Sequence, residues 1–180
     1  MTLINQNQIF SLSVVVPVFN EETSISSHIK DLISSLGNMM YDYEIIIVDD
    51  GSSDSTNKNI ELLQNKYLNK IKLISHPYNK GNGSAIKTGI RASSNDYIIC
   101  MDGDGQHSPL DIENLLKYLP DYDLVIGQRT GTYKGVWYRN FANWFYNKFA
   151  SSLVGFNVKD LTSGFRVFNA RVIKKYIDLL

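Results

Sequence analysis

Short apolar runs alternate along the chain with amphipathic stretches. Residues 13–18 ("SVVVPV"), 44–50 ("EIIIVDD") and 70–75 ("KIKLIS") are rich in β-branched side chains, which favour strands. Between the first two runs, apolar residues recur at helical spacing over 25–36. A second helix is predicted after the second run, with Asp54 as its N-cap. The pattern so far is strand, helix, strand, helix, strand.

The alternation continues in the next part of the chain. A helix is predicted over 83–92, a strand over 96–101 and a further strand over 122–127. Ser108 and Pro109 can open the helix between these strands as its N-cap and first residue. Such alternation predicts an α/β domain whose Rossmann-like, mostly parallel sheet is covered by helices on both faces. A length of 180 residues suits one domain.

Polar motifs follow four of the predicted strands, at residues 17–22, 49–54, 102–107 and 127–129. In open sheets of this kind, ligands bind at the carboxyl ends of the strands. We therefore expect the functional site at this edge. Asp49 or Asp50 can accept hydrogen bonds there from a base or a ribose.

Charge and cysteine content narrow the choice of partners. Eighteen basic residues balance eighteen acidic ones, so the chain has no net positive charge that would attract nucleic acid. Nucleic acid is therefore not an expected partner. The single cysteine, Cys100, lies in an apolar run and is expected to be a buried thiol in a reducing compartment. No apolar stretch approaches the roughly 20 residues that span a bilayer, and the first residues do not resemble a signal peptide. A cytoplasmic location is expected.

Aromatic residues gather beyond about residue 134. Five of them recur at helical spacing, namely Trp137, Phe141, Trp144, Phe145 and Phe149. One interpretation is a helix that packs these rings into the core. The other is a partly exposed aromatic face near a lipid or a membrane surface.

The segment 101–107 ("MDGDGQH") places two carboxylates two residues apart after a predicted strand. A calcium loop of the EF-hand type would need Gly where His107 stands, and a helix before it. A phosphatase with Asp102 as nucleophile would have Thr or Val in place of Gln106, and would leave the other motifs without a role. A site for Mg²⁺ or Mn²⁺ explains more, because the glycines let Asp102, Asp104 and the Gln106 carbonyl face one hard cation. Such an ion would stabilise a departing nucleoside diphosphate.

The segment 81–88 ("GNGSAIKT") nearly matches a phosphate-binding loop. Ile86 stands where the P-loop and the dinucleotide fingerprint both need a small residue, and a β-branched residue adopts a positive φ only at a cost. What remains is a glycine-flexible helix start with Lys80 and Lys87 nearby, which suits an anion. A solvated loop and helix is the alternative for both lysines.

Six segments carry a combined pattern: "VVVPVFNEE", "IIIVDDGSSDST", "NKGNGSAIKTGI", "MDGDGQHSP", "VIGQR" and "DLTSGFRVF". In this order they resemble family 2 glycosyltransferases of the GT-A fold, most closely the dolichyl- and polyprenyl-phosphate hexose synthases. The resemblance runs from about Leu12 to the last residues. It implies an inverting transferase that moves a hexose from a GDP- or UDP-sugar donor to the phosphate of a membrane polyprenol. Such an enzyme would be peripheral at the cytoplasmic face of a membrane.

The resemblance also implies roles for individual residues on the donor side. The residues that would line the nucleoside pocket are Pro17, Phe19, Glu21, Val48 and Asp50. Glu21 and Asp50 would be its polar anchors, and Lys87 and Gly103 would join the nucleotide site. The expected ligands of Mg²⁺ or Mn²⁺ are Asp102, Asp104 and Gln106.

On the acceptor side, Arg129 and Arg139 would hold the phosphate, because a guanidinium stays charged and offers a fork of donors. Together with Asp104 they form the expected catalytic set. A phosphate oxyanion is already deprotonated near neutral pH and needs no general base. If the acceptor is a sugar hydroxyl instead, as in a family 2 enzyme of cell-surface glycan synthesis, Asp160 becomes the first candidate base.

Two points stay open at this level. Residues 163–165 can be a tight structural turn or part of the site. A non-catalytic domain that binds a nucleotide sugar is an alternative to an enzyme. Residues 1–180 are expected to form a single GT-A catalytic domain, truncated at its C-terminal end because the pattern stops within a predicted helix.

Overall fold

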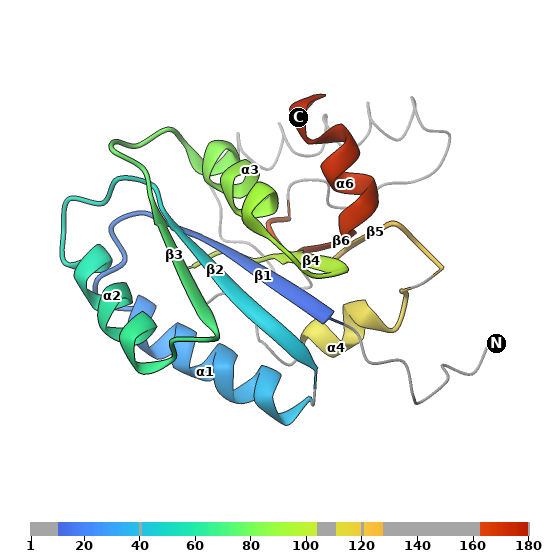
Figure 1. The fold of residues 1–180 in the computed structure, drawn as a ribbon, viewed down its shortest axis with the longest axis horizontal. Coiled ribbons are helices and arrows are strands. Elements are labelled where there is room, and N and C mark those ends of the chain that lie inside the picture. Colours follow the sequence, from blue (N-terminus) through green and yellow to red (C-terminus); the bar gives the residue numbers. More distant parts are fainter. Residues whose placement is uncertain (1–10, 40, 104–110, 120, 128–162, 180) are drawn as a thin grey trace, which may run out of the picture.

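The computed structural model describes residues 11–39, 41–103, 111–119, 121–127 and 163–179. The strands are β1 (Ser11–Val18), β2 (Asp42–Asp49), β3 (Ile71–Ser75), β4 (Tyr97–Cys100), β5 (Leu124–Ile126) and β6 (Arg166–Asn169). The helices are α1 (Ile25–Asn38), α2 (Thr56–Lys66), α3 (Asn82–Ala92), α4 (Asp111–Leu116), α6 (Ala170–Tyr176) and the 3₁₀ turn η1 (Ile177–Leu179). Up to β5 they follow the predicted alternation (Figure 1).

The strands form one six-stranded sheet in the order β3-β2-β1-β4-β6-β5. β1 pairs in parallel with β2 and β4, and β2 pairs in parallel with β3. β6 is antiparallel to both β4 and β5, so β5 again runs in the direction of β4. The mostly parallel sheet predicted from the sequence is therefore confirmed. The β6 strand, inserted between two predicted neighbours, was not predicted.

Helices cover both faces of the sheet, as predicted (Figure 1). On one face the main hydrophobic core contains alternate β1 residues, Val14, Val16 and Val18, together with apolar residues of α1, α2 and α4. On the other face Val15 packs with Ile90 of α3 and Ile173 of α6. This alternation follows from the two-residue period of a strand, which sends successive side chains to opposite faces.

The start of α2 differs slightly from the sequence prediction. The helix begins at Thr56, and Ser55 rather than Asp54 occupies the N-cap position. The Asp54 carboxylate still accepts the Thr56 amide at 2.9 Å, and it also accepts the Glu22 amide at 3.2 Å. Although Asp54 lies one residue before the N-cap, its carboxylate accepts a free backbone amide at the start of α2. It also links this helix start to the β1–α1 loop.

The sheet changes its direction of winding between β1 and β4. From β1 the chain passes through α1 to β2 on one side, whereas β4 is reached from β3 through α3 on the other side. β4 pairs with β1 only as far as Val15 and Cys100, so Pro17 and Val18 lie beyond this pairing. Such a switch point is where ligands bind in open α/β sheets.

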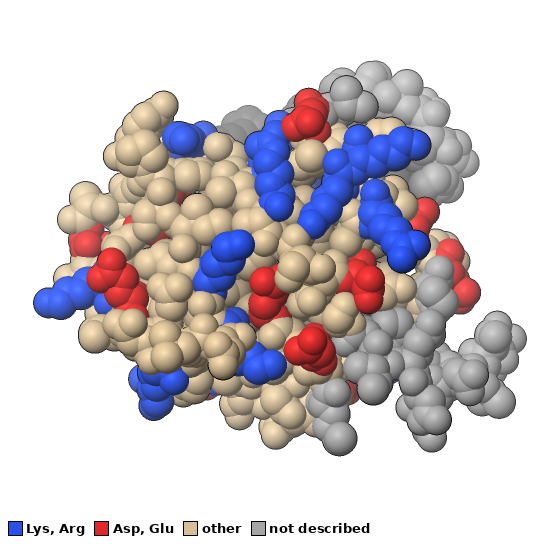
Figure 2. All heavy atoms as spheres, in the orientation of Figure 1, with Lys and Arg blue, Asp and Glu red and all other residues tan. Residues whose placement is uncertain are grey.

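Acidic and basic side chains are interspersed over the face of the molecule drawn in Figure 2. This distribution agrees with the net charge of zero. No helix in the described ranges is long and apolar enough to cross a membrane.

Candidate active site

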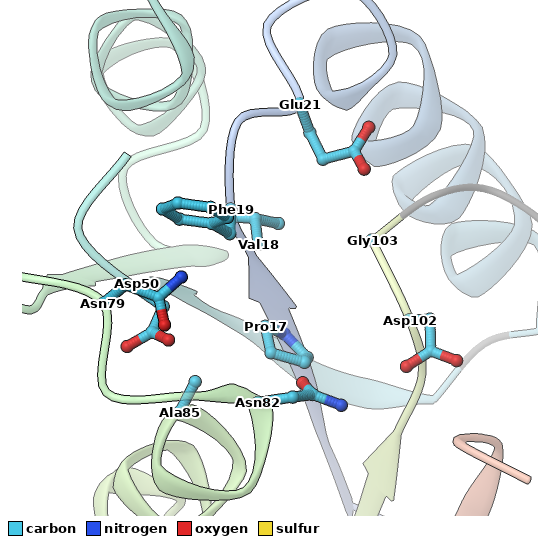
Figure 3. A pocket seen from close by; sticks show the side chains of 10 residues that line it. All are labelled: Pro17, Val18, Phe19, Glu21, Asp50, Asn79, Asn82, Ala85, Asp102 and Gly103. Atoms are coloured by element: carbon cyan, nitrogen blue, oxygen red, sulfur yellow. The ribbon is translucent and has the colours of Figure 1, made fainter. Parts of the chain in front are cut away.

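A cavity of about 360 Å³ lies at the switch point, at the carboxyl ends of β1, β2 and β4. It is lined by Pro17, Val18, Phe19, Glu21, Asp50, Asn79, Asn82, Ala85, Asp102 and Gly103. Figure 3 shows Asp50 and Asp102 on opposite sides of it, with Pro17 and Val18 between them. The volume is within the range of small-molecule sites.

The floor and rim of the cavity come from the end of β1. Phe19 is 43% exposed although it is a large apolar side chain, so its ring is available to a ligand. Glu21 follows on the β1–α1 loop, where its Oε2 accepts the Ser24 hydroxyl at 2.5 Å. The Glu21 amide donates to Thr56 Oγ1 at 2.7 Å, which fixes this loop to the start of α2.

Asn20 locks the two loops together further. It has a positive φ of 55°, which Asn tolerates better than most residues. The backbone amide of Asn20 donates to Ser52 Oγ at 2.9 Å, and its side-chain Oδ1 accepts the backbone amide of Ser53 at 2.9 Å. The loops that follow β1 and β2 therefore form one hydrogen-bonded unit at the cavity rim.

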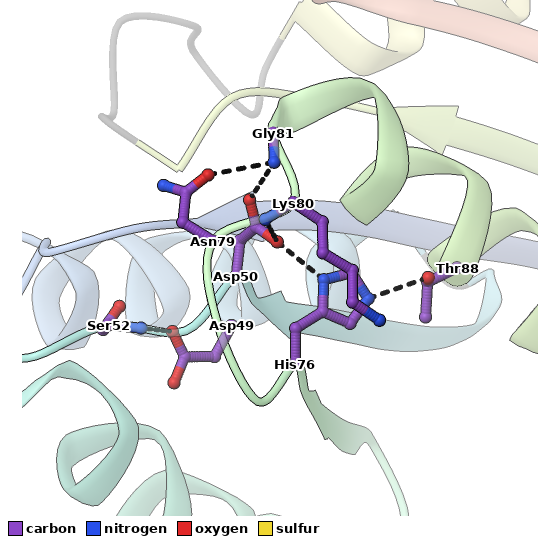
Figure 4. A network of polar contacts seen from close by, with 8 residues as sticks. All are labelled: Asp49, Asp50, Ser52, His76, Asn79, Lys80, Gly81 and Thr88. Atoms are coloured by element: carbon purple, nitrogen blue, oxygen red, sulfur yellow. Dashed lines mark hydrogen bonds and ion pairs between the residues drawn. The ribbon is translucent and has the colours of Figure 1, made fainter.

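Asp50, on the second strand's side, has a buried and heavily hydrogen-bonded carboxylate (Figure 4). Oδ1 lies 2.6 Å from His76 Nδ1 and accepts the Lys80 amide at 3.0 Å, while Oδ2 accepts the Gly81 amide at 2.8 Å. Burial raises the pKa of this carboxyl, but the donors from His76, Lys80 and Gly81 outweigh it and hold the pKa below its ordinary value. Asp50 is therefore ionised near neutral pH.

Asp102, on the fourth strand's side, is hemmed in by glycine backbone. A Cβ on Gly164 would collide with the Asp102 carboxylate, at 2.5 Å from Oδ1 and closer still to Oδ2. A Cβ on Gly103 would lie 3.0 Å from the Pro17 carbonyl oxygen and would collide with the Val18 side chain. The turn 163–165 thus has a structural role and also contacts a wall of the cavity.

Six of the predicted site residues meet in this cavity, namely Pro17, Phe19, Glu21, Asp50, Asp102 and Gly103. Val48 is fully buried in β2 and packs with Ile46 and Ala85. Lys87 is half-buried on α3. Neither Val48 nor Lys87 is among the described lining residues. The remaining predicted residues lie outside the described ranges: Asp104, Gln106, His107, Arg129, Arg139 and Asp160, together with the aromatic segment after residue 134 and the helix opening at 108–109.

Sequence reasoning missed His76, Asn79 and Asn82, which hold or line the same cavity. One signal was present: His76 directly follows β3, so the rule that directs ligands to the carboxyl edge applies to it as well. Its partner could not be read from the sequence.

Of the three predicted metal ligands, Asp102 is the one that the described part of the chain includes, and it lines the cavity. The Asp102 carboxylate is of the type that hard cations prefer, and it stands on the cavity wall. The described ranges contain no group of three or more His, Cys, Asp or Glu residues able to hold an ion.

Comparison with known proteins assigns the family. A family model described as "Glycosyl transferase family 2" matches residues 13–177, which is most of the chain. The chain belongs to glycosyltransferase family 2. The family resemblance predicted from the sequence motifs is thereby confirmed.

Among curated relatives of this family 2 chain, the dodecaprenyl-phosphate galacturonate synthase of Rhizobium johnstonii is 29% identical over 170 residues. That alignment covers 93% of this chain and 50% of the relative. The dolichyl-phosphate beta-glucosyltransferase of Dictyostelium discoideum is 30% identical over 186 residues, covering 94% of this chain and 57% of the relative. The chain thus spans about half the length of these relatives.

A solved structure supports the fold of the family 2 chain. The glucosyl-3-phosphoglycerate synthase from Mycobacterium tuberculosis, in complex with Mn²⁺, uridine diphosphate and phosphoglyceric acid, matches with a TM-score of 0.69 at 23% identity. The match covers 91% of this chain and 57% of that one. At this identity the likeness is one of fold, and the fold is GT-A, as predicted.

Proposed function

We propose that this chain is the catalytic domain of an inverting glycosyltransferase that moves a hexose from a nucleotide-diphosphate sugar to a polyprenyl phosphate. The observation that carries the proposal is the cavity at the switch point, which places Asp50 and Asp102 on opposite walls. A nucleoside needs hydrogen-bond acceptors and an apolar or aromatic surface, whereas a diphosphate needs positive charge. The Asp50 wall offers acceptors to the nucleoside, and the Asp102 wall offers a carboxylate that could hold the cation needed by the diphosphate.

The nucleoside half would lie against Asp50, Glu21 and Phe19. An ionised carboxylate is a strong acceptor for the N–H groups of a base or the hydroxyls of a ribose. The exposed ring of Phe19 offers an apolar surface beside them. This arrangement serves GDP- and UDP-sugars alike.

The diphosphate half would lie toward Asp102. We assign Asp102, Asp104 and Gln106 as the residues that would hold Mg²⁺ or Mn²⁺, with Gly103 giving the loop its freedom to bend. When bound, the ion would supply charge stabilisation to the leaving nucleoside diphosphate. The Mycobacterium tuberculosis neighbour, whose crystals hold Mn²⁺ and uridine diphosphate, supports the presence of a divalent ion by analogy of fold.

The acceptor assignment rests on the curated relatives, whose names specify dodecaprenyl phosphate and dolichyl phosphate. A phosphate oxygen would donate a lone pair to the anomeric carbon while the bond from that carbon to the diphosphate oxygen breaks. The nucleoside diphosphate would leave with the bonding electrons, and the configuration would invert. Arg129 and Arg139 would position the acceptor phosphate, so that catalysis depends on orientation and charge rather than on a general base. Peripheral attachment at the cytoplasmic face of a membrane would follow from such an acceptor.

A second candidate acceptor is a sugar hydroxyl. The contact between Gly164 and Asp102 brings the described end of the "DLTSGFR" segment to the cavity wall, and Asp160 lies four residues earlier in that segment. A carboxylate placed there would be suited to deprotonate a hydroxyl.

The decisive experiment offers the protein both types of acceptor. The protein is incubated with Mg²⁺ or Mn²⁺, a panel of GDP- and UDP-hexoses, and either a short polyprenyl phosphate or an oligosaccharide. Products are identified by mass spectrometry. A charged glycolipid supports the phosphate acceptor, whereas a longer oligosaccharide with no glycolipid would overturn it in favour of the hydroxyl. Failure to bind any nucleotide sugar would refute both.

A further inference from the structure

His76 is a buried histidine that links three elements at the cavity (Figure 4). It directly follows β3, and its amide donates to the Asp49 carbonyl of β2 at 2.8 Å. Its Nδ1 lies 2.6 Å from Asp50 Oδ1, and its Nε2 lies 2.9 Å from Thr88 Oγ1 on α3. One imidazole thus joins the ends of β2 and β3 to the helix that borders the cavity.

The hydrogen bonds fix the protonation of the ring on one side. Because an ionised carboxylate can only accept, Nδ1 must carry the proton that it donates to Asp50. Nε2 then accepts from the Thr88 hydroxyl when the ring is neutral, or donates to Thr88 Oγ1 when the ring is charged. The contact with Thr88 is therefore kept in either state.

The Asp50 carboxylate in turn organises the segment before α3. Its two oxygens accept the Lys80 and Gly81 amides, and Gly81 has a φ of +90°, a conformation that glycine adopts readily. Asn79, which precedes these amides, and Asn82, which follows them, both line the cavity. The Asp50 carboxylate therefore helps to hold this wall in place, together with Asn79 Oδ1, which also accepts the Gly81 amide at 2.9 Å.

The same segment also lies directly over Gly51. A Cβ on Gly51 would come within 2.5 Å of the Tyr78 carbonyl carbon, and Gly51 has a φ of +76°. The backbone of residues 78–81 is thus held by close packing against Gly51 and by hydrogen bonds to Asp50. A wall fixed in this way is preformed for a ligand, and preformed sites bind more tightly because less ordering is needed.

We infer that His76 is a positioning residue for the nucleoside half of the cavity. Its Nδ1–H occupies one acceptor site of Asp50 Oδ1, which directs the carboxylate toward the Lys80 and Gly81 amides. A carboxylate has about four lone-pair sites, and three donors already contact this one. The remaining site, on Oδ2, is then held in one direction, ready for a donor group of the ligand. That the ligand is a nucleoside diphosphate rests on the proposed function.

A matched pair of substitutions separates the two ring nitrogens. In His76→Asn, the side-chain amide can donate to Asp50 from near the place of Nδ1. In His76→Gln, the longer amide reaches toward Thr88, near the place of Nε2, and leaves Asp50 without this donor. Both variants are polar and lose the ring, so any general loss of packing is common to them. His28→Asn removes another buried histidine, on α1 across the sheet, and controls for that loss.

Hydrogen exchange tests the positioning without any ligand. We expect the Lys80 and Gly81 amides to exchange about tenfold faster in His76→Gln than in the unmodified chain, because the Asp50 carboxylate that accepts them is no longer held in place by His76 Nδ1. In His76→Asn and His28→Asn these amides should exchange at close to the original rate. Equal exchange in His76→Asn and His76→Gln would overturn the inference, whether both match the original chain or both exceed it.

Nucleotide binding tests the consequence, with UDP and GDP as probes in calorimetry. We expect His76→Gln to raise the Kd of the bound nucleotide about tenfold and His76→Asn to raise it about threefold or less. In turnover assays the KM of the donor should rise in His76→Gln while kcat changes less, because the reacting centre lies toward Asp102. A fall in kcat with unchanged KM would contradict the role.

Thr88 gives an independent check on the other nitrogen. Thr88→Val removes the hydroxyl but keeps the shape, and Thr88→Ser keeps the hydroxyl. The Kd should rise about threefold in Thr88→Val and stay near the original value in Thr88→Ser, and the opposite order would count against the inference. If the unmodified chain binds neither UDP nor GDP, the proposed function fails, whereas the exchange of the Lys80 and Gly81 amides still decides whether His76 positions this wall.

Discussion

Asp50 and Asp102 both follow strands at the same edge of the sheet, yet the protein holds them by different means. Asp50 is almost completely buried and accepts three hydrogen bonds from its own chain. Asp102 is half-buried, and the backbone of Gly164 lies so close that no larger residue fits there. Three donors orient the first carboxylate, and the nearby backbone of Gly164 limits the space around the second.

The difference teaches what each position can do. An ionised carboxylate that already accepts three hydrogen bonds has few lone pairs left for a cation, but it offers a fixed acceptor to a neutral ligand such as a nucleoside. The Asp102 carboxylate is only half-buried and lines the cavity, so its oxygens can face a cation there. The two walls of the cavity therefore differ in the partner they suit, although both carry the same residue type.

The largest expected effect comes from Asp102→Asn. If Asp102 holds the metal, turnover of the nucleotide sugar should fall roughly 1,000-fold, because a bound ion contributes several kcal/mol to stabilising the leaving group. The measurement is kcat/KM for donor consumption over a range of Mn²⁺ concentrations. Asp121→Asn, at an exposed position, serves as the control. If Asp102→Asn kept its turnover, Asp102 would not be needed to hold the metal, and the two carboxylates would not differ in the way described above.

Asp50→Asn should act on stability as well as on binding. The lowered pKa of Asp50 means that its ionised form stabilises the fold above the unfolded value of about 3.9, and this contribution is lost as the pH falls through the lower folded pKa. Replacing the carboxylate should cost roughly 3 kcal/mol at pH 7, because the charge is lost and an NH2 group takes the place of one of the two accepting oxygens. Urea unfolding at pH 7 and below pH 4 measures this.

The sign of the pH effect provides the check on Asp50. The difference in unfolding free energy between the unmodified chain and Asp50→Asn should be large at pH 7 and should shrink as the pH is lowered. A difference that stays constant down to the acid transition would mean that the charge of Asp50 is not what the donors stabilise.

Gly164→Ala tests confinement by shape. A new methyl group would collide with the Asp102 carboxylate, so the turn or Asp102 must shift, at a cost of about 1–3 kcal/mol. Gly37→Ala is the matched control, because no atom lies within 4 Å of a Cβ there and the residue is in α1, where alanine is the better helix former. Thermal unfolding should show a loss for Gly164→Ala and a small gain for Gly37→Ala. Equal behaviour would show that Asp102 is not confined by this turn.

The smallest effect is expected at Cys100, the last residue of β4. Burial raises the pKa of the Cys100 thiol to about 12, so almost no thiolate is present near neutral pH. In the folded protein the thiol should not react with a disulfide reagent at pH 8, and it should react quickly after unfolding in urea. Rapid labelling of the folded protein would mean that β4, which leads to Asp102, opens readily. Asp102 would then not be held in a fixed position on the cavity wall.

The sequence predicted local structure well because its signals are local. Apolar periodicity and turn residues identified five strands and the helices between them, and the rule for carboxyl ends predicted where Asp50 and Asp102 would meet. β6 was missed because four residues carry little periodicity, and its place depends on pairing with β4 far away in the chain. The segment 163–165, which precedes β6, could be a turn or part of the site from the sequence alone, and the structure places Gly164 next to the Asp102 carboxylate.

The partners of Asp50 escaped prediction for a similar reason. Asp50 was expected to be an anchor for a ligand, yet three of its acceptor positions are used by His76, Lys80 and Gly81, which lie 26 to 31 residues away in sequence. Spacing along a chain indicates which strand end a residue belongs to. It does not indicate which side chains from two such ends meet in space.

The insertion of β6 also has a consequence for the order in which the chain folds. β1 to β4 pair in parallel within the first 100 residues, and α1 to α3 can cover them at once. β5 pairs with β6, and β6 fills the place beside β4, so β5 reaches its position only after Arg166–Asn169 has been synthesised. Long-range pairing of this kind is slow to form. During translation, the edge of β4 next to Asp102 therefore stays unpaired until the ribosome has passed the turn that confines that carboxylate.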